Sequence, residues 1–76
     1  MTNVRESLSD RVRLSLRVEL ARRNWNATQL AERVGVSDMW VSRRMRGLTD
    51  FTVSDLDRVA DALDVPVEVL LGERAA

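Results

Sequence analysis

Two short segments in the middle of the chain carry apolar residues on one helical face. The first follows Asn26 and stops at Gly35, and the second follows Ser37 and stops at Gly47. Asn and Ser are favoured helix N-caps, and glycine often ends a helix. The pattern predicts two helices joined by a tight turn. Their apolar positions are Leu30, Ala31, Val34, Val41 and Met45.

A longer helix is predicted after Thr52, with a short one following it. The run TVSD from Thr52 to Asp55 resembles a capping box in which Asp takes the role of Glu or Gln. Pro66 interrupts this helix and can open a last short helix, which Gly72 ends. The apolar face of the longer helix consists of Leu56, Val59, Ala60 and Leu63.

The ten residues from Arg11 to Leu20 admit two interpretations. Polar and apolar residues alternate there, as they do in a half-buried strand. A lone strand would leave its edges unpaired, however, and no second strand-like run exists in the chain. A helix is therefore favoured, and the whole chain is predicted to be all-α. In a helix the apolar residues form two stripes on nearly opposite sides, Val12, Leu16 and Leu20 on one and Leu14, Val18 and Ala21 on the other.

Composition excludes most enzyme classes. The chain has 76 residues, enough for one domain, and contains neither cysteine nor histidine. Zinc sites of the usual kind and catalysis by Ser-His-Asp or Cys-His groups are therefore excluded. The three glycines form no phosphate-binding loop, and no acidic pair is clustered. We expect a protein that is not an enzyme and uses no metal or cofactor.

The chain shows no membrane or export signal. Its longest apolar run is a few residues, too short to span a bilayer. The N-terminal sequence MTNVRESLSD lacks an apolar signal core. We therefore expect a cytoplasmic protein without a membrane partner.

The charges are unevenly distributed although their total is zero. Through Phe51 there are ten arginines and six acids, and from Thr52 onward two arginines and six acids. The first part thus carries +4 and the second −4. Every basic residue is Arg, which codon usage in a GC-rich genome can explain. The alternative explanation is that guanidinium groups suit phosphates and guanine edges, and a basic half is compatible with nucleic-acid binding.

The segment Ala27–Arg46 carries the most specific pattern. Ala31 supplies a small residue where two helices touch, and Gly35 tolerates the positive φ of a tight turn. The motifs LAERVGVS and VSRRMRG resemble the helix-turn-helix of the Cro and phage-repressor family, the xenobiotic-response-element-like group. The similarity extends through LARRNWN before the motifs and LDRVADALDVPVEVLL after them, which covers residues 16–71.

The resemblance implies a five-helix, lambda-repressor-like domain whose third helix enters the major groove of DNA. We expect a flexible N-terminal arm over residues 1–8, the DNA-binding domain over 9–72, and a tail or the start of a linker over 73–76. Two positions depart from the family pattern. Arg44 stands at an apolar position, so that Met45 is expected to take over the packing. Ala27 stands where many members carry Gln, so Thr28 or Gln29 could substitute for that contact.

Eleven residues are candidates for DNA contact. Arg43 is expected to meet either a guanine edge or a phosphate, and Asp38 either a cytosine amino group or only the helix dipole. Trp40 can lie on the DNA backbone or cover the second helix. Trp25 is expected in the core and the pair Arg22 and Arg23 on a solvated face. The eleven candidates are Asn26, Thr28, Gln29, Ser37, Asp38, Met39, Trp40, Ser42, Arg43, Arg44 and Arg46.

The remaining candidates have simpler expected roles. Met39 can touch a thymine methyl group, Ser42 can meet a base or a phosphate, and the two arginines Arg44 and Arg46 are expected at phosphates.

The sequence therefore predicts specific binding of double-stranded DNA by a nucleoid-associated transcriptional repressor of phage or bacterial origin. One alternative is the DNA-targeting module of a larger protein, such as an immunity repressor with a second domain, an antitoxin or a recombination factor. Another is a helical protein–protein module. A second copy of the chain is a further expected partner, as a weak homodimer or a pair formed on DNA. Its contact surface would be the second apolar stripe of residues 11–20 or the last helix.

Overall fold

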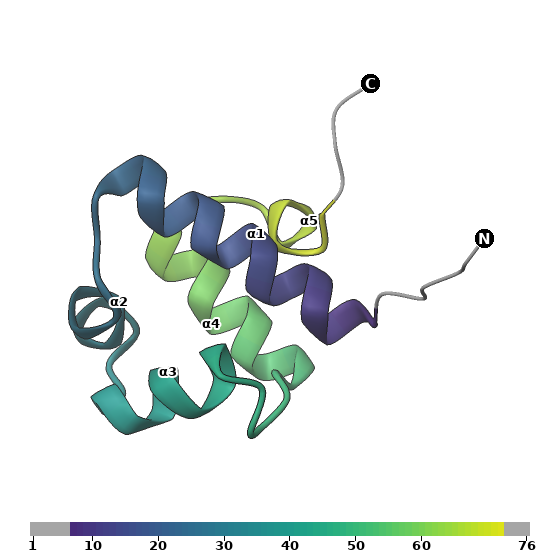
Figure 1. Ribbon diagram of the computed structural model, residues 1–76. Coiled ribbons are helices and arrows are strands. Elements are labelled where there is room, and N and C mark those ends of the chain that lie inside the picture. The colour runs from purple at the N-terminus through teal and green to yellow at the C-terminus, as the bar shows by residue number, and fades with distance from the viewer. Residues whose placement is uncertain (1–6, 73–76) are drawn as a thin grey trace.

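Five α-helices make up the part of the chain that the computed structural model describes, residues 7–72 (Figure 1). No strand occurs within residues 7–72, so the all-α prediction is confirmed. The expected arm and tail lie largely in 1–6 and 73–76, outside the described residues. Leu8, which we placed at the end of the arm, is the first residue of a helix. The helices are α1 (Leu8–Arg23), α2 (Ala27–Val34), α3 (Asp38–Met45), α4 (Val53–Leu63) and α5 (Val67–Leu70).

Local side-chain caps define where four of the helices begin. The Ser7 hydroxyl accepts a hydrogen bond from the backbone of α1, and Ser37 does the same for α3. Asn26 begins α2 and Thr52 begins α4, each through a complete capping box. The caps at Asn26, Ser37 and Thr52 were predicted from the sequence, whereas Ser7 lay in the expected arm. Pro66 precedes α5 and makes no such bond.

The ends of the helices use left-handed backbone conformations. Gly35 ends α2 with a φ of 88°, as its identity predicts. Asn24 ends α1 and Asp64 ends α4 in the same region, with φ of 58° and 59°. Asn and Asp tolerate this conformation better than other residues with side chains, so both helices stop without glycine.

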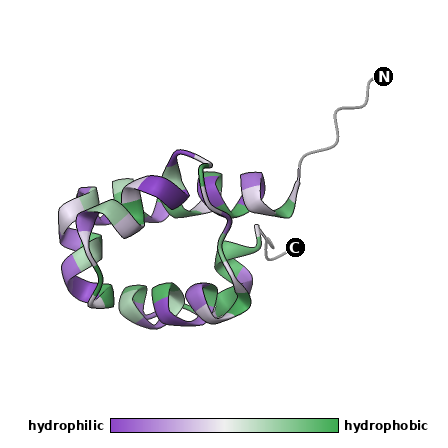
Figure 2. Cartoon of the chain, turned by 90° about the horizontal axis from the view of Figure 1, so that it is seen from below, coloured by the Kyte–Doolittle hydropathy of each residue, from purple (hydrophilic) through white to green (hydrophobic). Residues whose placement is uncertain are grey.

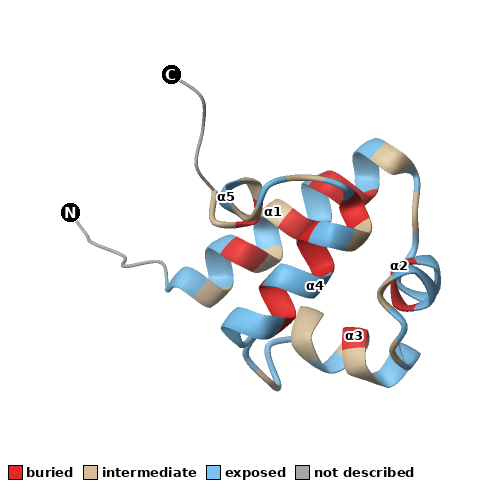
Figure 3. Cartoon of the chain, turned by 180° about the vertical axis from the view of Figure 1, so that it is seen from behind, coloured by how far each residue is buried: buried red, intermediate tan, exposed pale blue. Residues whose placement is uncertain are grey.

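The helices enclose one apolar core. α5 approaches both α1 and α4, and α2 approaches both α3 and α4, while α3 and α5 lie toward opposite ends (Figure 1, Figure 3). Hydrophobic and hydrophilic residues alternate along each helix (Figure 2), as amphipathic helices require. The buried residues are Val12, Leu16, Leu20, Leu30, Ala31, Val41, Leu56, Val59, Ala60, Leu63 and Leu70.

The core includes only one of the two apolar stripes of α1. Leu16 is completely buried, whereas Leu14 and Val18 on the opposite side are 56% and 47% exposed. The first predicted stripe therefore faces the core and the second faces outward (Figure 3). Trp25 is half-buried and packs against the core, as expected.

Arg23 does not lie on a solvated face, contrary to the prediction. One guanidinium nitrogen donates to the Glu19 carboxylate at 2.7 Å. The other donates to the carbonyl oxygen of Leu63 at 2.9 Å. Arg23 thus joins the C-terminal ends of α1 and α4. Its neighbour Arg22 does have an exposed side chain.

Candidate nucleic-acid interface

A tight turn at Gly35 joins α2 to α3. The Ala31 carbonyl accepts hydrogen bonds from the N–H groups of Gly35 and Val36, at 2.8 and 3.0 Å. A Cβ at Gly35 would meet no atom within 4 Å, so there is room for a side chain. Glycine is favoured here because of the positive φ of 88°. Leu30 and Val41 are each 1% exposed, one in each helix beside the turn. The two eight-residue helices are thereby held in a helix-turn-helix.

One side of α3 faces away from the rest of the molecule. At roughly 100° per residue, positions 38, 39, 42, 43 and 46 share about 140° of the helix surface. Met39 is 61% exposed, and the arginines Arg43 and Arg46 are exposed too. Val41 points the opposite way and is buried. The outward face, which we define as Asp38, Met39, Ser42, Arg43 and Arg46, therefore contains five of the eleven predicted contacts.

The first turn of α2 contains three more predicted contacts, all exposed. Asn26 accepts from the backbone N–H of Gln29 at 2.8 Å, and the Gln29 side-chain oxygen accepts from the N–H of Asn26 at 2.8 Å. Thr28 lies between them in sequence. The first turn of α2 contains no acidic residue. The carboxylate nearest to this turn in the chain's own contacts is that of Asp38, which comes from α3.

Thr28 and Asp38 connect the first turns of α2 and α3. The Thr28 hydroxyl donates to the Asp38 carboxylate at 3.0 Å. The sequence analysis did not anticipate this bond, because the two residues belong to different helices. Asp38 also stands in the first turn of α3, where a carboxylate complements the helix dipole. The bond holds the two exposed helix starts in a defined relative position.

Ser37 and Trp40 contribute to the structure of α3 itself. The Ser37 hydroxyl accepts from the N–H of Trp40 at 3.1 Å and caps the helix. The Trp40 ring packs edge-to-face on Phe51, with ring centroids 6.4 Å apart and an interplanar angle of 76°. Trp40 is half-buried against the core. Its aromatic neighbour Phe51 follows α3 in the chain.

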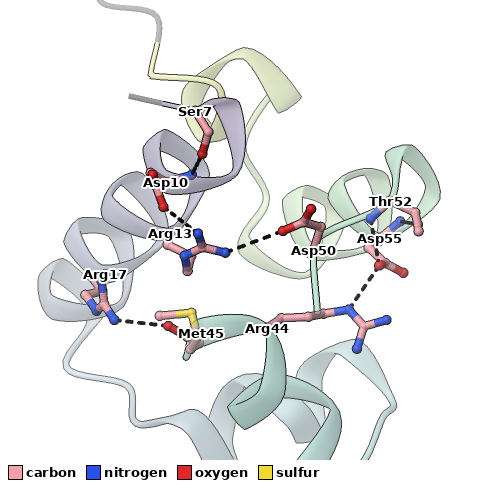
Figure 4. Close-up of polar contacts among 9 residues, drawn as sticks. All are labelled: Ser7, Asp10, Arg13, Arg17, Arg44, Met45, Asp50, Thr52 and Asp55. Atoms are coloured by element: carbon pink, nitrogen blue, oxygen red, sulfur yellow. Dashed lines mark hydrogen bonds and ion pairs between the residues drawn. The ribbon is translucent and has the colours of Figure 1, made fainter. Parts of the chain in front are cut away.

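Arg44 has protein partners in place of the expected phosphate. Its Nε donates to the Asp55 carboxylate at 3.0 Å, and its guanidinium carbon lies 3.9 Å from the centroid of the Trp40 ring (Figure 4 shows the bond to Asp55). Only 14% of the Arg44 side chain and 10% of the Asp55 side chain are exposed. We therefore leave Arg44 out of the proposed DNA contacts. Met45 packs against the core in its stead, as predicted.

Two arginines of α1 approach the C-terminal end of α3, and sequence reasoning missed both. Arg17 donates to the Met45 carbonyl at 3.1 Å (Figure 4). The Arg13 guanidinium carbon lies 3.6 Å from where a Gly47 Cβ would stand. Hydrogen bonding from Arg13 also lowers the pKa of the Asp10 carboxyl. Their four-residue spacing indicates a shared face of α1, but nothing in the sequence connects that face to α3.

The Asp55 carboxylate is expected to stabilise the fold near neutral pH and to lose this effect in acid. Burial raises the pKa of this carboxyl, but hydrogen bonds from Thr52 and Arg44 outweigh burial and lower it below the ordinary 3.8. A lowered pKa in the folded state stabilises the fold above pH 3.8, and the effect is lost as the pH falls through the folded-state value. We expect Asp55→Asn to be less stable than wild type near neutral pH.

Urea unfolding between pH 7 and pH 2.5 measures this effect. The difference between wild type and Asp55→Asn should shrink below pH 4, with Asp57→Asn, an exposed carboxylate of α4, as the control. A difference that stays constant to pH 2.5 would contradict the assignment.

A short helix, a glycine turn and a second helix with an exposed, arginine-bearing face define a helix-turn-helix domain. A family model described as a helix-turn-helix domain matches residues 11–71. The chain belongs to this family, and membership indicates binding of double-stranded DNA. Comparisons with curated proteins and with solved structures gave no match. No helix within residues 7–72 is long and apolar enough to cross a membrane.

Proposed function

We propose that this chain binds a specific double-stranded DNA sequence and acts as a transcriptional repressor of phage or bacterial origin. It would prevent transcription by occupying its operator. The observation that carries the proposal is the outward face of α3, where Arg43 and Arg46 stand exposed on a helix that a buried Val41 anchors. The resemblance of the two motifs to Cro and phage repressors supports the regulatory role.

In the proposed complex α3 lies in the major groove. Arg43 donates two hydrogen bonds to O6 and N7 of a guanine, and Met39 contacts a thymine methyl group. Arg46 stands three residues after Arg43 and meets a phosphate at the edge of the groove. Ser42, between the two reading positions, bonds to a base or a phosphate.

The starts of α2 and α3 complete the proposed contacts. The exposed first turn of α2, with Asn26, Thr28 and Gln29, receives a phosphate at side-chain amide groups, because the capping box uses only the oxygens of Asn26 and Gln29. Ser37 and Asp38 lie at the start of α3. The Asp38 carboxylate either accepts from a cytosine amino group or acts through the helix dipole and its bond from Thr28.

We propose further that two copies bind together on DNA. A helix of eight residues is about 12 Å long and reads only a few base pairs, so such domains usually occupy two half-sites. The outward stripe of α1 supports pairing, since Leu14 and Val18 line a groove that continues to Val65 and Val69. The last helix was the other expected contact surface, but its Leu70 is completely buried in the core of its own chain. The pair in free solution is expected to be weak.

The experiment that tests the function is selection from a random double-stranded DNA library. The enriched duplex and a random duplex of equal length then serve as probes. Arg43→Ala is expected to weaken binding to the enriched duplex by about 1–3 kcal/mol and to relax the preference at one base pair. Arg46→Ala should weaken binding to both duplexes by similar factors, because a phosphate contact is independent of sequence.

The variant Arg58→Ala is the matched control, because Arg58 is an exposed arginine of α4 and does not line the groove of Leu14 and Val18. It should bind both duplexes as wild type does. Equal losses on both duplexes for Arg43→Ala would assign this residue to a phosphate. Failure of the wild-type protein to enrich any sequence would contradict the proposed function.

A further inference from the structure

The recognition helix α3 depends on side chains for its position relative to α4. Its backbone approaches that of α2 closely, and α2 in turn approaches α4. Val41 lies in the core and Met45 packs against it, while polar bonds join the C-terminal half of α3 to α1 and α4 (Figure 4). These polar bonds add a directional limit on how far the end of α3 can move while its start stays on α2.

One carboxylate oxygen joins α3 to the start of α4. Oδ2 of Asp55 accepts from Nε of Arg44 at 3.0 Å and from the backbone N–H of Thr52 at 2.9 Å. The second bond is half of the capping box of α4. Arg44 is thus attached to a carboxylate that the first turn of α4 already holds in place. Movement of α3 relative to α4 would break the Arg44 bond or disturb the cap.

Trp40 holds the Arg44 guanidinium on a second side. The guanidinium carbon lies 3.9 Å from the ring centroid, a stacked cation–π arrangement. Nη1 of Arg44 also donates to the Trp40 carbonyl at 3.3 Å. Phe51 supports the ring from the loop that leads to α4. A planar guanidinium can stack and bond at its edge together, whereas a lysine ammonium cannot.

Small movements of α3 would have large effects on base contacts. A tilt of about 10° around the start of a 12 Å helix moves its far end by about 2 Å. Hydrogen bonds to base edges do not tolerate such a displacement, because their donor–acceptor distances vary by only about 0.5 Å. Arg43, the residue proposed to read guanine, directly precedes Arg44. The Arg44 attachment therefore bears on the alignment of the reading side chain.

We propose that Arg44 is a positioning residue for DNA recognition, which sets the orientation of α3 through Asp55 and Trp40 and does not touch DNA. The proposal rests on the proposed function. A positioning residue and a phosphate contact affect different properties of DNA binding. A positioning residue controls the preference for one sequence over others, whereas a phosphate contact adds affinity for every sequence and steepens the salt dependence.

The test measures the affinities of Arg44→Met for the enriched duplex and for a random duplex over a range of salt concentrations. We expect the preference for the enriched duplex to fall by about tenfold, the effect of losing one aligned base contact. Affinity for the random duplex and the salt slope should stay at wild-type values. Arg46→Met is the matched control, and should lower both affinities and reduce the slope by about 0.9 for each copy bound.

Three further variants separate positioning from general stability. Arg44→Lys keeps the charge and loses the stacked fork, so it should lose preference as Arg44→Met does. Asp55→Asn keeps an oxygen for the α4 cap and should also lose preference. In the double variant Arg44→Met with Asp55→Asn, the loss should be no larger than in either single variant, since both break one link. Partial unfolding would lower both affinities equally and leave the preference unchanged.

Fluorescence of Trp40 in a Trp25→Phe background gives a readout without DNA. Removal of the stacked guanidinium should change its emission. An unchanged preference in Arg44→Met would overturn the positioning role, and so would a reduced salt slope, which would assign Arg44 to a phosphate. If instead the wild-type protein enriches no sequence, the selection experiment contradicts the proposed function, and the positioning role of Arg44 is contradicted together with it.

Discussion

Replacement of Leu16 by Ala is expected to lower the free energy of unfolding by about 3 kcal/mol. Leu16 is completely buried, midway along α1 and one turn from two other core residues, Val12 and Leu20. The substitution removes three carbon atoms and leaves a cavity that neighbouring helices can fill only in part. A domain of this size has a total stability of roughly 4–11 kcal/mol. The variant should therefore unfold at a much lower urea concentration.

Leu14→Ala is the matched control, because it makes the same chemical change two residues away in the same helix. Leu14 is 56% exposed, so its truncation should cost about 0.5 kcal/mol or less. Urea unfolding followed by circular dichroism measures both variants. Equal losses would mean that both stripes of α1 are buried in solution, through self-association for instance, and repetition at a tenfold lower protein concentration would identify that case.

The starts of α2, α3 and α4 and the end of α2 could be predicted from the sequence because their causes are local, whereas the two ends of α1 were not predicted. The boxes at Asn26 and Thr52 each depend on a side chain three residues further on. Gly35 adopts a left-handed conformation, which costs little free energy because glycine has no Cβ. The outward face of α3 followed from helical periodicity once Val41 was assigned to the core. Which base or phosphate each of its residues meets stays a prediction.

The stripes of α1 could not be distinguished in the same way. Leu14 and Leu16 are the same residue type and stand in similar local sequence, with polar residues on either side. Only the position of α4 and α5 decides which of them is buried, and that position is a property of the whole fold. The alternation also imitated a strand, because two opposite helical stripes produce apolar residues at every second position.

The charged residues near the core were the hardest to interpret. Arg44 finds its carboxylate 11 residues later in the chain, and Arg23 bonds to a carbonyl 40 residues away. No local pattern indicates such partners. An arginine on a helix that also carries a DNA-facing surface is therefore easily taken for a phosphate contact. The presence of Arg at an apolar position of the family pattern was the one signal that Arg44 has a different role.

Binding to the enriched duplex is expected to weaken roughly 12-fold when the concentration of monovalent salt rises from 50 to 200 mM. Each copy places one exposed arginine, Arg46, at a phosphate, and two copies place two. Each neutralised phosphate releases condensed counterions, so the slope of log K against log salt should be about −1.8. Fluorescence anisotropy with a labelled duplex measures it.

The same slope reports how many copies bind. A single copy carries one such arginine, which gives a slope of about −0.9 and a loss of roughly 3.5-fold over the same range. A duplex with one half-site should therefore show about half the slope of the complete site. The Arg46→Ala variant should lose about 1.8 of the slope on the complete site and about 0.9 on the half-site. Equal slopes on the two duplexes would rule out pairing, and a flat dependence on both would contradict a DNA-binding role for the arginine face.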